Sequence, residues 1–220
     1  YNDFYALIGA QVDRSQEGLI VELGSGIGNL KQHIPECICT DMFPNPWIDQ
    51  VENAYRMSFA DESVSNLILF DVFHHLEYPK AALNEFRRVL KPHGRVILFE
   101  PCISALGWIV YGAFHKEPVA WFDKINLDGG PISDDRLGYY AAQGNACRIF
   151  RHSRKYRDLI GDFSITKVRR YAALAYVMSG GYSGRQLYPD RLYPFIKSCE
   201  KVLNHLPSLF ATRLLVVLTK

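Results

Sequence analysis

The sequence lacks a strong excess of charge. Its 220 residues contain 25 Lys and Arg against 23 Asp and Glu, which gives a formal net charge of +2 with histidine neutral. Nucleic-acid-binding domains usually carry a concentrated basic stripe. The most basic segment, residues 148–157, has the spacing of the polar side of one helix, which favours a solvated face over a phosphate-binding one. The composition therefore gives no reason to expect nucleic acid as a partner.

Cysteine is also scarce, and its five positions show no metal-type clustering. Cys37 and Cys39 alternate within an apolar segment, so both are expected to be buried thiols rather than ligands. The sequence contains no run of 18 apolar residues that could cross a bilayer, and its first residues do not form a signal-peptide pattern. We therefore expect a cytoplasmic protein with no transmembrane segment, and we identify no set of metal ligands.

What is present is an alternation of strand-like and helix-like segments. Such an alternation is typical of a parallel sheet whose two faces are covered by helices. The turn Lys91–Gly94 ends one helix, since Pro92 cannot continue it and Gly94 is free to adopt a positive φ. Apolar runs predict strands at residues 19–23, 36–41, 65–71 and 95–100, and helical spacing predicts helices at 2–13, 27–32 and 80–90.

Residues 102–146 interrupt this alternation and are rich in aromatics and glycine. No internal repeat and no low-complexity linker divides the chain. We therefore expect one α/β domain spanning residues 1–220, with 102–146 as an insertion. Beyond the insertion, the pattern predicts a helix at 148–160, a strand at 165–177, a helix near 189–204 and a strand at 212–218.

A glycine loop, Gly24-Ser25-Gly26-Ile27-Gly28, follows the first expected strand. Such a loop lets the backbone approach a ligand where any Cβ would collide. A dinucleotide fingerprint would need glycine at position 29, which is Asn29. Glu22, at the end of the strand, would repel a pyrophosphate but suits a ligand with a cationic amino group. The loop therefore indicates a nucleotide-like ligand that carries an amino group.

Carboxylates follow the other strand ends at the same edge of the expected sheet. Asp41 ends the second strand, where an acidic residue commonly accepts hydrogen bonds from ribose hydroxyls, and the adjacent Met42 is placed to lie against an adenine face. The alternative for Asp41 is a turn-forming role in Asp-x-x-Pro. Phe70 and Asp71 end the third strand and are expected to line the cofactor pocket.

Four segments in this order resemble the motifs of class I S-adenosylmethionine-dependent methyltransferases. Val21–Asn29 resembles their motif I, and Asp41 matches their acidic motif at the second strand. Leu69–Pro79 resembles the LHHL-x-D-P segment of the group that includes the quinone-biosynthesis C-methyltransferases. Glu85–Gly94 resembles the E-x-x-R-V-L-K-P-G-G turn of that group. The resemblance covers residues 17–101.

This resemblance implies a Rossmann-like sheet of seven strands with the last one antiparallel, and S-adenosyl-L-methionine as the cofactor. The adenine-binding Asp-Ala pair of the family aligns with Asn53-Ala54, where the Asn oxygen can still accept a hydrogen bond from the adenine amino group. The expected cofactor contacts are Glu22, Gly24, Ser25, Gly26, Gly28, Asp41, Met42, Asn53, Ala54, Phe70 and Asp71.

The expected catalytic residues are His75, His74 and Glu100, which also follow strand ends on the ligand side. Histidine is the best-matched base at neutral pH, and Glu100 is placed to orient it or to bind an acceptor hydroxyl. Alternatively, the histidine pair caps the helix that begins near Pro79, and Glu100 only closes its strand. Which ring faces the pocket stays open at this point.

The insertion occupies the position where this family builds its acceptor lid. Its apolar segment 103–114 is too short to span a bilayer, and it favours a packed lid helix over an interfacial segment facing a lipid-linked substrate. Polar contacts to an acceptor are expected from 115–118 and from Tyr139, Tyr140 and Asn145.

The segment Glu100–Val119 resembles a subgroup of bacterial methyltransferases encoded among surface-polysaccharide genes. This implies O-methylation of a sugar or glycan-precursor hydroxyl, and the alternative is a lipid-linked acceptor that faces the interfacial segment described above. Three other functions stay open: C-methylation of a quinone-like ring, a non-catalytic cofactor-binding module suggested by Asn53, and an NAD-dependent enzyme, which Asn29 disfavours.

Overall fold

The computed structural model describes residues 1–128, 140–181 and 184–220. The expected positions Tyr139 and the rest of 129–139 lie outside this description. The strands are β1 (Leu19–Leu23), β2 (Ile38–Asp41), β3 (Gln50–Val51), β4 (Val64–Phe70), β5 (Leu90–Pro101), β6 (Ser164–Tyr171) and β7 (Arg213–Thr219). The helices are α1 (Asn2–Gly9), α2 (Pro79–Val89), α3 (Ala105–Ala113), α4 (Asn145–Arg151), α5 (Arg157–Ile160), α6 (Leu174–Met178), α7 (Tyr193–Leu203) and α8 (Pro207–Phe210), with 3₁₀ turns η1 (Asn29–Gln32), η2 (Phe73–His75) and η3 (Asp190–Leu192).

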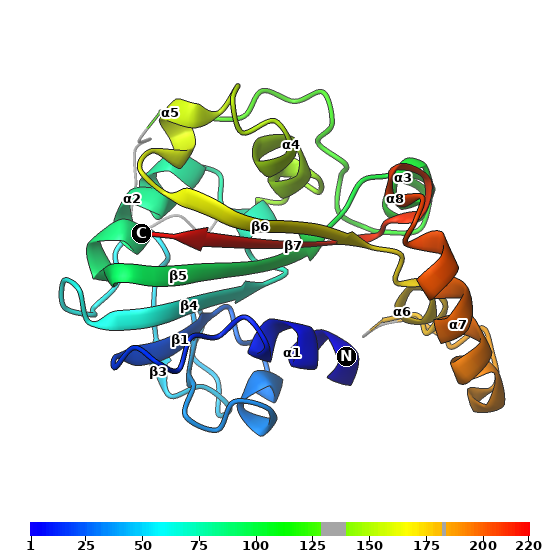
Figure 1. Ribbon diagram of the computed structural model, residues 1–220, viewed down its shortest axis with the longest axis horizontal. Helices are drawn as coiled ribbons and strands as arrows, with labels where there is room; N and C mark the ends of the chain where they lie inside the picture. The colour runs from blue at the N-terminus through cyan, green and yellow to red at the C-terminus, as the bar shows by residue number, and fades with distance from the viewer. Residues whose placement is uncertain (129–139, 182–183) are drawn as a thin grey trace.

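The strands form one seven-stranded sheet in the order β3-β2-β1-β4-β5-β7-β6 (Figure 1). Strands β1 to β5 pair in parallel, whereas β7 runs antiparallel to both β5 and β6. Parallel neighbours need crossover connections, so the helices between them cover the two faces of the sheet. The expected α/β fold class, a Rossmann-like and mostly parallel seven-stranded sheet, is confirmed, as is the antiparallel last strand.

The two faces of the sheet bury separate apolar cores. Alternate residues of β4 show this division, because successive side chains of a strand point to opposite faces. Leu67 and Leu69 pack in a core with side chains of α2, α4 and α5, whereas Ile68 packs with side chains of α1. Every residue of β4 except its last is buried, which explains the apolar run Leu67–Phe70 in its second half.

Several expected elements differ from the structure. The helix expected at 27–32 is only the 3₁₀ turn η1, and the helix expected at 2–13 ends at Gly9. The helix expected at 148–160 is broken into α4 and α5, because Phe150 and Tyr156 face the same core. Six residues apart, they would lie about 120° apart around one continuous helix, away from a common narrow face. The strand expected at 165–177 ends at Tyr171, and the chain turns into α6. There the buried Glu200 of α7 accepts a hydrogen bond from the backbone N–H of Ala175 at 2.8 Å, which satisfies the start of this short helix.

The turn before β5 also differs in its detail. The residue with positive φ is His93, at 65°, and not Gly94. Gly94 is required for a different reason: a Cβ there would lie 2.9 Å from the carbonyl oxygen of Lys91. The turn is tied to the end of the chain, since the N–H of His93 donates to the carbonyl of Lys220 at 3.0 Å.

The insertion places its elements in two different positions. Helix α3 contacts α8 beyond one end of the sheet, and it exposes Trp108, Ile109 and Phe114 (Figure 1). The segments on either side of 129–139 run past η2 instead, with a bridge between Val119 and Gln143. Within the three described ranges, no helix has the length and apolar character needed to cross a bilayer.

Candidate active site

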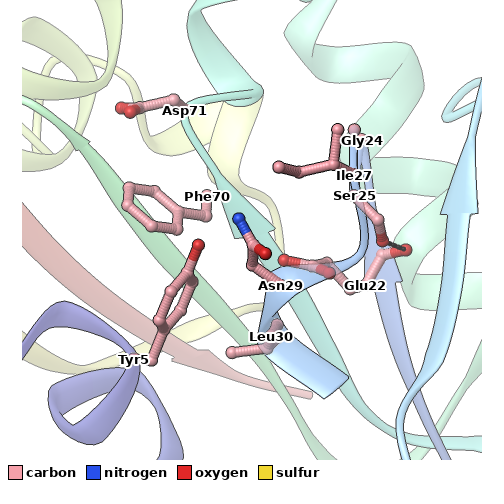
Figure 2. A pocket seen from close by; sticks show the side chains of 10 residues that line it. Tyr5, Glu22, Gly24, Ser25, Ile27, Asn29, Leu30, Phe70 and Asp71 are labelled. Carbon is pink, nitrogen blue, oxygen red and sulfur yellow. Dashed lines mark hydrogen bonds between the residues drawn. The ribbon is translucent and has the colours of Figure 1, made fainter. Parts of the chain in front are cut away.

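A pocket of about 260 Å³ lies at the carboxyl ends of β1 and β4. Figure 2 shows Glu22 and Ser25 on one side of it and Tyr5 and Phe70 on the other. Ligands of open α/β sheets bind at this edge, where the strand order reverses between β1 and β4. The lining consists of six residues expected from the sequence, Glu22, Gly24, Ser25, Gly26, Phe70 and Asp71, and four that were not expected, Tyr5, Ile27, Asn29 and Leu30.

The glycine loop adopts a backbone conformation that other residues rarely take. Gly24, Gly26 and Gly28 have φ values of 68°, 54° and 69°. A Cβ at Gly26 would meet no atom within 4 Å, so the backbone here borders open space beside the pocket. At Gly28, by contrast, a Cβ would lie 2.6 Å from the carbonyl oxygen of Trp47. One glycine thus exposes the backbone to a ligand, and the other permits close packing.

Asp41 holds the glycine loop from the neighbouring strand. Its carboxylate accepts a hydrogen bond from the N–H of Gly26 at 3.0 Å and another from the N–H of Phe43 at 3.1 Å. The second bond is the turn-forming interaction that was the alternative for this residue. Asp41 therefore joins the loop to the β2 turn, and its place next to Gly26 remains compatible with ribose binding.

The other expected cofactor contacts lie outside the lining of the pocket. Met42 is half-exposed, at 48%. The side-chain oxygen of Asn53 accepts a hydrogen bond from the N–H of Tyr55 at 2.9 Å, and Ala54 packs against the core. Because an amide oxygen has two lone pairs, this turn leaves Asn53 able to accept one more hydrogen bond.

Glu22 is a carboxyl group buried in the wall of the pocket. It is 4% exposed, and its Oε2 atom has no hydrogen-bond partner among the described residues. Burial raises the pKa of Glu22 to about 8. A buried acid without a full set of partners is costly, and a cationic amino group would supply the missing one. This orphaned oxygen fits the amino group of the expected cofactor.

Asp71 forms an ion pair that the sequence did not suggest. It has a positive φ of 57°, and its carboxylate binds the guanidinium of Arg213, which is 1% exposed. The charge of Asp71 keeps the pKa of Arg213 well above its usual value despite burial. An arginine in the otherwise apolar stretch Arg213–Thr219 was the available signal. Its guanidinium lies 4.4–5.8 Å from the ring centres of Tyr176, Phe4, Phe70 and Phe99.

His74 is buried and fixed by Glu100. Its Nδ1 lies 2.7 Å from Oε2 of Glu100, which is itself fully buried and accepts hydrogen bonds from the N–H groups of Val72 and Phe73. Burial opposes the charge of the imidazolium, but Glu100 and then Glu117 outweigh it and raise the pKa of His74 to about 10. The structure thus gives Glu100 a place behind His74 rather than at a solvent-exposed surface.

His75 is the more accessible ring of the pair. Its side chain is 30% exposed, and its Nδ1 lies 2.9 Å from the carbonyl oxygen of Tyr140. Burial and the neighbouring His74 lower its pKa. The two rings are 4.1 Å apart, and the Nε2 atoms of both approach Glu117, at 3.4 Å from His74 and 3.8 Å from His75.

The position of Glu117 was not expected from the sequence. The segment 115–118 was expected to offer polar contacts, but nothing in its pattern indicated the histidine pair as its neighbour. Two backbone hydrogen bonds bring the insertion to η2: the N–H of Ala142 donates to the carbonyl of His74 at 2.9 Å, and the N–H of Gln143 donates to that of Pro118 at 3.1 Å.

The histidine pair and the pocket belong to one continuous segment. Asp71 lines the pocket, and η2 follows it directly. Val72 also touches the glycine loop, because a Cβ at Gly24 would lie 2.4 Å from its Cγ2 atom. Helix α2, which the pair was alternatively expected to cap, begins at Pro79 after a cap residue, Tyr78, whose side chain makes no capping hydrogen bond.

Comparison with known proteins supports the same region. Residues 21–98 match the family described as a methyltransferase domain. A search of curated proteins found no match. The fold is similar to an S-adenosylmethionine-dependent methyltransferase from Mesorhizobium loti, at 14% identity and a TM-score of 0.53, covering 98% of this chain and 96% of that one.

Two further solved structures show the same fold. One is the geranyl diphosphate C-methyltransferase of Streptomyces coelicolor A3(2), at 9% identity and a TM-score of 0.56, covering 99% of this chain and 77% of that one. The other is a possible histamine N-methyltransferase from Thermotoga maritima, at 15% identity and a TM-score of 0.52, covering 100% and 94%. At these identities the likeness shows the fold, whereas the family match concerns the segment that holds the glycine loop and the histidine pair.

Proposed function

We propose that this S-adenosylmethionine-dependent methyltransferase methylates a hydroxyl group of a small molecule, and that the hydroxyl belongs to a sugar or a glycan precursor. The family match over residues 21–98 and the fold support the enzyme class and the cofactor. One observation carries the choice of O-methylation: two histidines and two glutamates converge at η2, the segment that directly follows Asp71 of the pocket lining, and such a cluster can accept a hydroxyl proton. A ring carbon needs such help less.

The cofactor would be held by the glycine loop and its neighbours. Glu22 would bind the amino group, Asp41 the ribose, and the backbone at Gly26 would approach the ligand closely. The cofactor supplies an electrophilic methyl group on its sulfonium. The residues of the chain then have two tasks, which are to align the acceptor with that methyl group and to keep water out.

The acceptor hydroxyl would lie beside the histidine pair. A base here takes the hydroxyl proton as the oxygen forms its bond to the methyl carbon. Because the Nδ1 atoms of both histidines are held by oxygen acceptors, their Nε2 atoms are presented together to the site. In the proposed histidine- and glutamate-assisted base, His75 takes the proton, since its pKa is lowered and its ring is neutral near pH 7. His74, whose pKa is raised to about 10, and Glu100 behind it hold the charge and the position of the pair.

The surroundings of the pair favour a polar acceptor over a flat ring. Glu117, Tyr140 and Gln143 all approach the two histidines, and all three come from the insertion. This supports residues 102–146 as an acceptor-binding lid of a single domain. The five cysteines are free thiols, which supports a reducing compartment such as the cytoplasm.

The proposal is tested by methyl transfer from labelled S-adenosylmethionine to a panel of nucleotide sugars, free glycans and quinols. We expect label on a hydroxyl oxygen of a sugar. Label on a ring carbon of a quinol would replace the proposal by C-methylation. Calorimetry with S-adenosylhomocysteine is the companion measurement, since binding without transfer to any member of the panel would favour a non-catalytic module.

A further inference from the structure

We propose that His74, His75 and Glu117 form a binding site for a divalent transition-metal ion of the zinc type. The inference deepens the proposed function and rests on it for the position of the acceptor. It concerns how the histidine pair activates a hydroxyl. Residues far apart in the sequence supply the three groups, which is why no ligand set was identified from the sequence.

The three side chains converge on one point. One ligand atom from each lies within 4.8 Å of the others. Nε2 of His74 is 3.4 Å from Oε2 of Glu117, and Nε2 of His75 is 3.8 Å from Oε1 of the same carboxylate. Ligand atoms at about 2.0–2.2 Å from a tetrahedral zinc ion are about 3.3 Å from one another. A small inward movement of His75 would therefore complete the arrangement.

The groups behind the two histidines orient them as metal ligands. A metal-binding histidine almost always donates its other ring N–H to a carboxylate or a backbone carbonyl, which fixes the tautomer and the direction of the ring. Glu100 accepts from Nδ1 of His74 at 2.7 Å, and the carbonyl of Tyr140 is 2.9 Å from Nδ1 of His75. A carboxylate thus lies behind one ring and a backbone carbonyl behind the other, and both direct Nε2 toward the same site, where an ion would displace the Nε2 proton of His74.

Gln143 gives an independent indication of a ligand. It is 2% exposed, its Oε1 atom has no hydrogen-bond partner among the described residues, and its Nε2 lies 3.4 Å from Nε2 of His74. The amide also contacts Glu117. Its Nε2 donates to Glu117 in this structure, so a 180° rotation that turns the orphaned oxygen toward the site would be favourable only with an ion between that oxygen and the carboxylate.

The surrounding charge suits a dication. Glu117 and Glu100 contribute two carboxylates, one at the site and one behind His74. Asp71 adds a further negative charge that acts on His74. The Nδ1 atom of His115 lies 3.8 Å from Glu117, and its side chain is 42% exposed. Two imidazoles and one carboxylate form the ligand set typical of catalytic zinc, which keeps a position open for substrate or water.

The ion would act as a Lewis acid on the acceptor hydroxyl. An oxygen that binds it has a lower pKa, so the O–H bond breaks and its proton goes to solvent. The oxygen lone pair then forms the bond to the methyl carbon, and the electrons of the carbon–sulfur bond remain on sulfur. No group is oxidised or reduced, so the step needs no further reactant.

Zinc titration by calorimetry tests the proposal directly. After treatment with a chelator and its removal, the wild-type chain is expected to bind one Zn²⁺ with saturable heat. His75→Ala and Glu117→Gln should each weaken this binding at least about tenfold, because each removes a ligand. The matched control is His205→Ala, which removes an exposed imidazole whose Nδ1 lies 3.1 Å from the carbonyl oxygen of Val202.

Binding of S-adenosylhomocysteine by the same preparations separates the possible outcomes. If it persists in both variants while Zn²⁺ binding falls, the fold is intact and the site is supported. If the wild-type chain binds no Zn²⁺, or if both ligand variants bind it as well as His205→Ala does, the metal site is wrong and the histidines act as a base. That result leaves the proposed function standing. If instead the wild-type chain binds Zn²⁺ but transfers a methyl group to no acceptor of the panel, the proposed function is wrong and the metal site stands.

Discussion

The cofactor side of this site and its proposed acceptor side are built from different kinds of sequence. On the cofactor side, the groups that line the pocket are mostly neighbours in the chain, between Glu22 and Leu30 and at the end of β4. On the acceptor side, His74, Glu100, Glu117 and Gln143 come from four separate segments. A short motif therefore indicates the methyl donor, whereas the side chains proposed to bind the acceptor meet only after the insertion has folded onto η2.

The largest expected effect comes from removing a histidine at the acceptor side. His75→Gln should lower the rate of methyl transfer by about 10²–10⁴-fold, the usual contribution of an acid–base group. Affinity for S-adenosylhomocysteine should stay within about twofold, because no pocket-lining residue changes. Single-turnover transfer from labelled cofactor to the acceptor found in the panel measures the first quantity, and calorimetry measures the second.

This variant also tests whether cofactor binding and methyl transfer depend on different residues. A parallel loss of cofactor binding would mean that His75 supports the glycine loop as well as the acceptor. An unchanged rate would remove the histidine from the mechanism. His152→Gln is the matched control, since it changes an exposed histidine at the end of α4.

The second expected effect concerns the ion pair between Asp71 and Arg213, which holds the end of β4 between the pocket and η2. Asp71→Ala should lower the free energy of unfolding by about 3–5 kcal/mol, because it leaves the buried guanidinium of Arg213 without its carboxylate. The exposed pair Lys31–Asp49 provides a control: Asp49→Ala removes a surface ion pair, although it also removes the acceptor for the N–H of Cys39. Exposed pairs contribute about 0–1 kcal/mol.

Urea denaturation followed by circular dichroism would compare these variants. Asp71→Asn is a useful intermediate, since it keeps the shape of the side chain and an oxygen acceptor while removing the charge. If Asp71→Ala unfolds at the same urea midpoint as the wild type, the aromatic rings around Arg213 compensate its charge. The ion pair would then contribute little to the free energy of unfolding.

Most of the fold and half of the pocket could be predicted because their signals are local. The apolar runs ending on glycine or carboxylates specified β1, β2, β4 and β5, and the expected enzyme class and cofactor are confirmed with them. The boundary of β6 was missed because it depends on a hydrogen bond from Ala175 to Glu200, on a helix that follows later in the chain.

The remaining site residues were missed for the same reason of distance. Tyr5 reaches the pocket because α1 docks on the sheet, and Arg213 reaches Asp71 because β7 inserts between β5 and β6. Glu117 meets the histidine pair through backbone hydrogen bonds made by Ala142 and Gln143. A single sequence shows which residues are chemically capable, but pairing across the fold decides which of them meet.

The smallest expected effect sharpens the cofactor side through pH. Burial raises the pKa of Glu22 to about 8, so most of this carboxyl is protonated in the free protein near neutrality. A cationic amino group binds the ionised form, so binding expels the proton. Affinity for S-adenosylhomocysteine should therefore increase with pH, approaching about tenfold per unit between about pH 6 and 7.5, and level off above pH 8.

Glu22→Gln cannot ionise, so its affinity should be weaker near pH 8 and nearly independent of pH over this range. Calorimetry in buffers of different ionisation enthalpy would also detect the released proton. A wild-type affinity that stays flat, or that rises as the pH falls, would show that Glu22 is already ionised or does not meet the amino group, and the cofactor would then be held mainly by the glycine loop and Asp41.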